Sequence, residues 1–193
     1  MVLDCRTVAR GSLSCEREIS MFFEKRPAEP VKTEKIIGYK YSATGIFGYA
    51  FYCGGQKICT AISCTVPSSA VWIQGYGIRW KSGFDKESTL VPGLTTRYVF
   101  DDANAQVARL VYKSSGEYEI AEAVLVRCGE ISYSFFRDGE VIAQISRCEE
   151  KNIWKPASIG DDCEPWFAVD WEQELNPALR LLILSFPMLR FGF

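Results

Sequence analysis

The sequence of 193 residues contains no histidine. This absence removes imidazole as a general base, and with it Ser-His-Asp catalysis, Cys-His catalysis and every zinc site that includes histidine. The eight cysteines contain no C-x-x-C pair, so the spacing does not indicate a zinc site of four thiolates either. We therefore expect a protein that is not an enzyme and that has no catalytic residue, no metal and no cofactor.

The chain also lacks an apolar run long enough to cross a membrane. A spanning helix needs about 20 apolar residues, whereas the uncharged stretch 181–189 is bracketed by Arg180 and Arg190. The first ten residues carry Asp4 and Arg6 and contain no apolar run of the secretory type. We expect no transmembrane segment, a cytoplasmic location and cysteines that remain thiols.

An excess of one charge is missing as well. The 22 basic and 24 acidic side chains give a net charge of −2, so no global field attracts nucleic acid. An apolar fraction of 48% and this length are typical of one globular domain. We expect residues 1–193 to form a single domain. Residues 1–30 are expected to be a peripheral segment, in which residues 15–23 fit a short helix or an edge strand.

From about residue 31 onward the sequence is a series of short β-branched or aromatic runs, separated by Gly, Asp, Asn and Ser. This pattern is typical of sandwiches and barrels. In the run 56–66, alternation predicts a buried face with Ile58, Thr60 and Ile62, and places Cys59 and Ala61 on the opposite face. The predicted strands include residues 56–66, 71–80, 97–100, 106–113, 117–127 and 166–171.

The clearest local signal is a hairpin over residues 131–147. Asp138 and Gly139 lie between two apolar-rich runs and tolerate the positive φ of a type I′ turn. A two-residue loop fixes the register of the two strands. The predicted opposite pairs are Arg137 with Glu140, Phe136 with Val141, and Phe135 with Ile142.

The C-terminal segment 176–193 changes character and predicts a helix. Asn176 is a favourable N-cap, and Pro177 fits the first helical position, where its missing N–H is not needed. The segment is apolar around most of its circumference, which indicates that protein surrounds it. We expect Pro187 to kink or end the helix. A closed or nearly closed antiparallel sheet would enclose such a helix and also remove exposed strand edges.

A mainly β chain that ends in one hydrophobic helix resembles the tubby C-terminal-like superfamily, which includes phospholipid scramblases and LURP-one-related proteins. The resemblance lies in residues 135–147, similar to the family's Asp-Gly hairpin with an apolar strand closed by a basic residue, and in residues 166–193, similar to its last strand and core helix. It implies a barrel of about twelve strands around a central C-terminal helix. Tubby itself binds phosphoinositides through basic side chains.

Arg79 and Lys81 are the candidate ligand-binding residues. They lie on one face of a predicted strand with Trp80 opposite, which would present two cations beside an aromatic to a phosphate or a lipid head group. The alternative is that they are exposed charges that prevent association of strand edges.

Three acidic pairs have the oxygen ligands that calcium prefers, although adjacent acids in such loops are usually solvated turn residues. Residues 102–107 lack the glycine that a calcium loop needs at its sixth position. The pairs are Asp101-Asp102, Glu149-Glu150 and Asp161-Asp162.

Together these observations predict a non-enzymatic, tubby-like binding module that is cytoplasmic or peripheral at a membrane. Its expected partner is a phospholipid head group or another protein, and not a nucleic acid. Two other interpretations stay open. One is a scramblase-like lipid-handling protein that uses cysteine or carboxylate chemistry, and the other is a structural module that associates with itself.

Overall fold

The fold is taken from a computed structural model, which describes residues 35–43, 45–64, 70–84, 96–114, 116–121, 123–149 and 163–190. The predictions for residues 1–30 and for the acidic pair at 161–162 lie outside these ranges. The described elements are β1 (Ile36–Ala43), β2 (Ile46–Cys53), β3 (Gln56–Cys64), β4 (Val71–Gly75), β5 (Ile78–Phe84), β6 (Thr96–Asp101), β7 (Gln106–Ser114), β8 (Glu117–Ile120), β9 (Val124–Cys128), β10 (Ser132–Arg137), β11 (Glu140–Arg147), β12 (Pro165–Trp171) and α2 (Pro177–Arg190).

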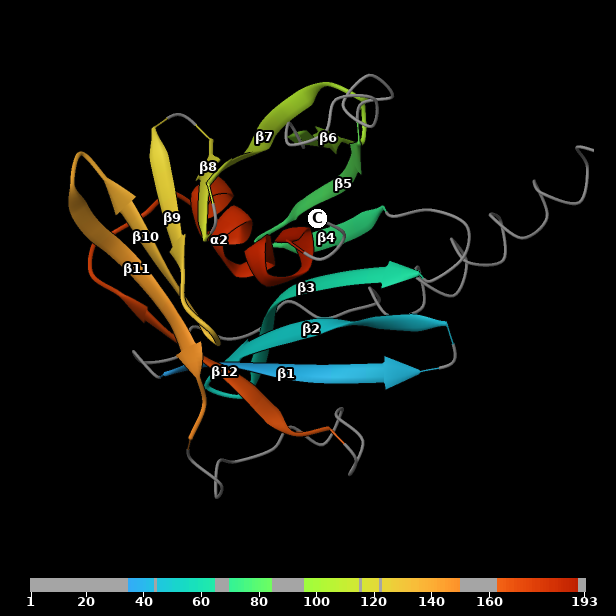
Figure 1. Ribbon diagram of the computed structural model, residues 1–193. Helices are drawn as coiled ribbons and strands as arrows, with labels where there is room; N and C mark the ends of the chain where they lie inside the picture. Colours follow the sequence, from blue (N-terminus) through green and yellow to red (C-terminus); the bar gives the residue numbers. More distant parts are fainter. Residues whose placement is uncertain are drawn as a thin grey trace, which may run out of the picture.

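The strands form one closed antiparallel barrel (Figure 1). Each strand pairs with the strands before and after it in the sequence, and β1 closes the barrel by pairing with β12, for example at Ile36 opposite Val169. The predicted fold class, a closed barrel of about twelve strands with a C-terminal helix, is confirmed. Closure leaves the sheet without an unpaired edge, so charges on these strands are not needed to protect one.

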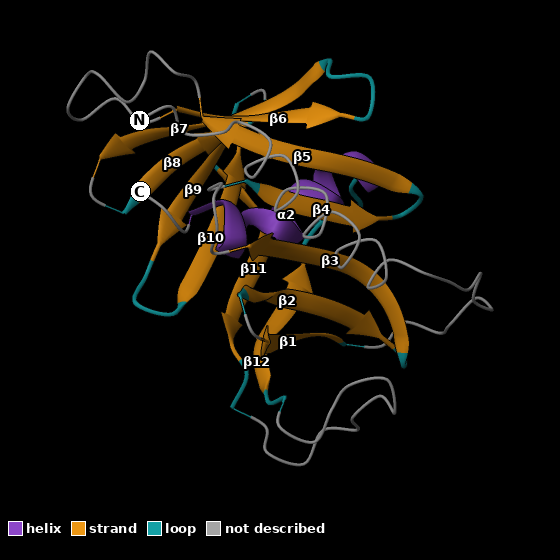
Figure 2. Ribbon diagram, turned by 90° about the vertical axis from the view of Figure 1, so that its right-hand side faces the viewer, coloured by secondary structure: helices purple, strands orange, loops and turns teal. Residues whose placement is uncertain are grey.

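Helix α2 lies inside the barrel, as Figures 1 and 2 show from two directions. Asn176 is its N-cap, because the backbone N–H of Leu179 donates to Asn176 Oδ1 at 2.8 Å. Of the two effects predicted for Pro187, a kink or an end, the end is excluded, since the helix continues to Arg190 with the proline inside it. Its buried residues are Leu179, Leu181, Leu182, Ile183, Leu184, Ser185, Phe186, Pro187, Met188 and Leu189.

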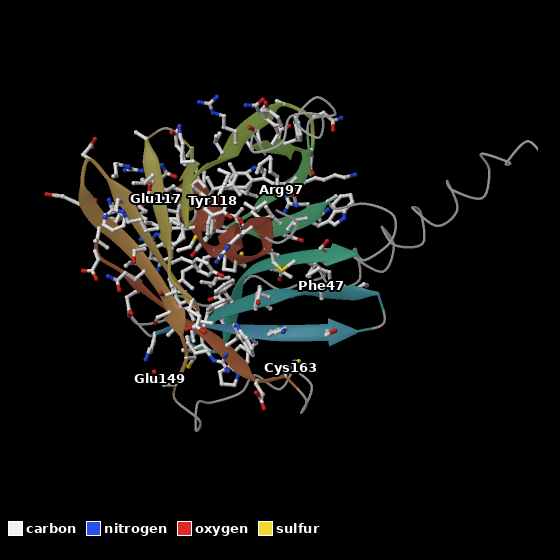
Figure 3. The ribbon with its side chains drawn as sticks, in the orientation of Figure 1. Phe47, Arg97, Glu117, Tyr118, Glu149 and Cys163 are labelled. Carbon is white, nitrogen blue, oxygen red and sulfur yellow. The ribbon has the colours of Figure 1, made fainter. Side chains whose placement is uncertain are left out.

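Aromatic contacts hold the helix against the strands that surround it. The ring of Phe186 makes edge-to-face contacts with Tyr118, Tyr133 and Phe135, with centroids 5.2–5.5 Å apart. Tyr118 is labelled beside the helix in Figure 3. On another side of the barrel Gly75 allows close approach, because a Cβ there would lie 2.8 Å from Leu181 Cδ1. The helix therefore contacts bulky side chains on some strands and nearly bare backbone on others.

In the structure, a turn divides each of two predicted strands into two shorter strands. The run 71–80 folds back at Tyr76 and Gly77, which have φ values of 51° and 77°, so that β4 and β5 form a hairpin. The run 117–127 is interrupted at Ala121 and Ala123, whose φ values are 50° and 59°. Tyrosine and alanine are rarely found at positive φ, and for this reason the sequence pattern did not reveal these turns. Strands β1 and β2 were not predicted individually.

The prediction for β3 is confirmed in part: Thr60 and Ile62 are buried as expected, but the opposite face is buried as well. Cys59 and Ala61 lie on the face opposite the one predicted to be buried. Both belong to the core cluster that contains the helix. Their small side chains suit a strand that lies close to α2, whereas alternation places Ile62 on the outer face, where it is fully buried as well. Alternation in the sequence could not assign the inner face because residues 59–63 are buried on both faces.

The hairpin of β10 and β11 has the predicted turn, with φ values of 53° at Asp138 and 85° at Gly139. Arg137 is opposite Glu140 and Phe136 is opposite Val141, as predicted. A register shift then places Phe135 opposite Ala143, not opposite Ile142. The bulge lets two consecutive residues, Ile142 and Ala143, be fully buried on one strand.

The described part of the chain contains no helix with the length and the hydropathy that a membrane span requires.

The contacts of Phe186 predict a large loss of stability in Phe186→Ala. Removing a fully buried phenylalanine from a packed core costs about 3–5 kcal/mol, from lost transfer free energy and from the cavity left behind. Val107→Ala, which truncates a side chain that is 43% exposed, should change the free energy of unfolding by less than about 0.5 kcal/mol. Urea unfolding of both variants checks this, and equal effects would contradict a helix-centred core.

Candidate functional site

Arg79 and Lys81 project from the outer face of β5. Both are exposed, whereas Trp80 between them points inward and is 8% exposed. This confirms the predicted arrangement of the three side chains. Arg79 lies opposite Gln74 and Lys81 lies opposite Trp72 on the adjacent strand β4.

The aromatic beside the two cations is Trp72 and not Trp80. The ammonium Nζ of Lys81 lies 4.2 Å from the centroid of the Trp72 ring, which is the geometry of a cation–π contact. The sequence does not indicate Trp72, because its pattern predicts one continuous strand over residues 71–80. Folding of that run into a hairpin places Trp72 directly across from Lys81.

Gln74 lies beside the two cations. Its Oε1 is buried and has no hydrogen-bond partner, while the residue lies directly across from the exposed Arg79. A buried acceptor without a partner is costly. Because this oxygen is shielded from solvent, the groups of this surface that a ligand can reach are the two exposed cations.

Strands β6 and β7 extend the surface. The register places Phe100 opposite Lys81 and Tyr98 opposite Arg109, and the rings of Tyr98 and Phe100 lie 6.3 Å apart. Val107, in the bulge of β7, is one of the exposed large hydrophobic residues. We call this surface the β4–β7 patch; it consists of Trp72, Gln74, Arg79, Lys81, Tyr98, Phe100, Val107 and Arg109.

The charge of the patch is concentrated on β5. On β7, Arg109 and Lys113 lie 3.8 Å and 2.8 Å from the carboxylate oxygens of Glu119, so their charges are partly neutralised. Arg79 makes no ion pair with a carboxylate in the described ranges. Arg79 is thus the cation of the patch most available to an anionic ligand.

The thiols inside the barrel are poor nucleophiles. Full burial raises the pKa of Cys59, and burial raises the pKa of Cys128 although Arg190 acts in the opposite direction. Attack requires the thiolate, so a raised pKa lowers reactivity at neutral pH. Cys53, Cys59, Cys128, Cys148 and Cys163 are free cysteines.

Arg97 is a fully buried cation that stabilises the end of the helix. Its Nη1 donates to the backbone carbonyl of Met188 at 3.4 Å, in the last turn of α2 (Figure 3). A positive charge there compensates the partial negative charge of the helix C-terminus. Burial lowers the pKa of Arg97 to about 10, so it remains charged at neutral pH.

In the acidic turn after β6, a carboxylate oxygen is already hydrogen-bonded to the backbone of the turn. Asp101 Oδ1 accepts hydrogen bonds from the N–H groups of Ala103 and Ala105, at 2.9 Å and 2.8 Å. In the described ranges no three His, Cys, Asp or Glu side chains lie close enough together to hold a metal ion. The residues of the Asp101-Asp102 pair therefore act as turn residues.

Comparison of the chain with protein-family models, with curated proteins and with solved structures found no match. The resemblance to the tubby-like superfamily stays a prediction.

Buried tyrosines predict a loss of stability in alkali. Burial raises the pKa of Tyr49 and of Tyr76 from 10.0 to about 12, so the folded state retains protons that the unfolded state releases. The stability that these groups contribute is complete below pH 10 and is lost as the pH rises toward 12. Arg97 acts in the opposite direction, because its folded pKa is lowered.

Tyr49→Phe isolates one of these groups. Between pH 9 and pH 12 the free energy of unfolding of this variant should fall about 2–3 kcal/mol less than that of the unchanged protein. Urea unfolding at each pH measures the difference. Parallel curves for the two proteins would show that Tyr49 titrates normally in the folded state.

Proposed function

We propose that this protein is a non-enzymatic binding module for anionic phospholipid head groups, with Arg79 and Lys81 as the residues that contact the phosphate. One observation carries the proposal. Two exposed cations occupy successive outward positions of β5, and a tryptophan of the neighbouring strand lies 4.2 Å from one of them.

The chemistry of the two cations is complementary. The planar guanidinium of Arg79 can donate two parallel hydrogen bonds to a phosphate, and the ammonium of Lys81 acts as a point charge. A phosphate group therefore fits this pair of side chains.

The aromatic residues of the patch suit the boundary between water and lipid. Trp72 and Tyr98 combine an apolar ring with a polar group, and such residues are enriched at membrane interfaces. Phe100 and the exposed Val107 add apolar surface next to the charges. The patch would lie flat on a membrane surface, and the protein would be cytoplasmic and peripherally attached.

Attraction to the membrane would be local, since the net charge is −2. Each lysine or arginine near an anionic leaflet contributes about 1 kcal/mol at physiological salt, so two residues give weak binding unless specific contacts add to it. The resemblance to the tubby superfamily supports the same class of ligand, as an analogy of fold. The lack of histidine and the raised pKa values of Cys59 and Cys128 support a role without catalysis.

Co-sedimentation with liposomes tests the proposal. The vesicles would contain phosphatidylcholine with or without a phosphoinositide, at low and at physiological salt. We expect binding that requires the phosphoinositide, weakens with salt, and falls at least tenfold in the double variant Arg79→Gln, Lys81→Gln.

A second double variant, Arg127→Gln, Arg137→Gln, removes the same number of positive charges from β9 and β10. It should bind vesicles like the unchanged protein. Equal loss in both variants would show attraction by net charge alone, and absence of binding at both salt concentrations would turn the search toward a protein partner.

A further inference from the structure

A second cluster of cations and an aromatic lies on another part of the barrel, where β1, β11 and β12 meet. Its centre is Trp166, at a register shift between β1 and β12: Gly38 is opposite Phe167, but Tyr39 is opposite Pro165. Trp166 is therefore the extra residue of a β-bulge, and bulges redirect the side chains that they contain. The backbone is held in place, because the N–H of Cys148 donates to the carbonyl of Trp166 at 2.9 Å.

Two cations from different strands converge on the Trp166 ring. Arg147 Cζ, at the end of β11, lies 4.0 Å from the ring centroid, and Lys40 Nζ, on β1, lies 4.6 Å from it. Both residues are exposed, and Trp166 is half-buried against the core. Strand β12 lies between the other two strands, so the barrel itself brings the three side chains together.

The two like charges contact the same ring. Because both lie so near the ring centroid, Arg147 Cζ and Lys40 Nζ are at most about 9 Å apart. This separation is similar to the Debye length of about 8 Å at physiological salt. Within the part of the chain that the structure describes, neither Lys40 nor Arg147 makes an ion pair with a carboxylate. The ring offsets part of the repulsion, and an anion bound to both cations would remove the rest.

We propose that Lys40, Arg147 and Trp166 form a second binding site, which takes a phosphate group. Phosphate has several oxygens at fixed angles, so it can accept two hydrogen bonds from the guanidinium of Arg147 while it also contacts Lys40. The ring fixes the positions of both cations before binding, which reduces the side-chain entropy lost when the anion binds. The site is separate from the β4–β7 patch, because β1, β2 and β3 lie between β12 and β4.

Calorimetric titration of the full chain with inorganic pyrophosphate tests the site. The unchanged protein should bind, and the double variant Lys40→Gln, Arg147→Gln should bind at least tenfold more weakly. Arg127→Gln, Arg137→Gln removes the same charge from β9 and β10 and should retain the affinity. Arg147→Lys retains the charge but loses the planar fork, and should weaken binding at least threefold.

A vesicle arm separates the two sources of the phosphate. If Lys40→Gln, Arg147→Gln weakens binding to pyrophosphate but not to phosphoinositide vesicles, the site takes a soluble phosphate compound; if it weakens both, the site accepts phosphate from either source. Equal weakening of pyrophosphate binding in the two double variants, or an unchanged affinity in Lys40→Gln, Arg147→Gln with a normal unfolding curve, would overturn the proposal.

Discussion

The structure depends on the burial of α2 inside a closed sheet. A helix that is apolar on nearly all sides has no stable place on a protein surface, and a single sheet face would cover only one side of it. The barrel covers all sides, and the pairing of β1 with β12 completes the enclosure. The strands differ in the size of the side chains that face the helix. Phe135 and Tyr133 fill space around Phe186, whereas Gly75 lets the backbone approach Leu181.

Much of this fold could be predicted from the sequence, because the decisive signals were local. Asn176 and Pro177 mark the helix start, and Asp138-Gly139 marks the hairpin. The hairpin turn at Tyr76 could not be predicted, since a tyrosine at positive φ is held there by the surrounding structure and not by its own preference. The inner face of β3 depends on the distance to α2, which no alternation pattern encodes.

The candidate site also combines features that the sequence predicts with features that it does not. The shared outward face of Arg79 and Lys81 follows from alternation along a single strand, so the sequence was enough to find it. Trp72, Gln74 and the cluster at Trp166 depend on which strands are neighbours and on their register, including a bulge. Both proposed sites thus depend on the barrel: the register of β4 and β5 places Lys81 beside Trp72, and the pairing of β12 with β1 and β11 places Lys40 and Arg147 beside Trp166.

Deletion of residues 176–193 tests whether the barrel requires its enclosed helix. Ten buried helical residues would be lost, at about 1.5–3 kcal/mol for each large apolar side chain, which exceeds the 5–15 kcal/mol stability of a typical domain. We expect a chain without a cooperative thermal transition and without near-ultraviolet circular dichroism. A soluble truncated protein that unfolds cooperatively would contradict this expectation, because the barrel would then be stable without its helix.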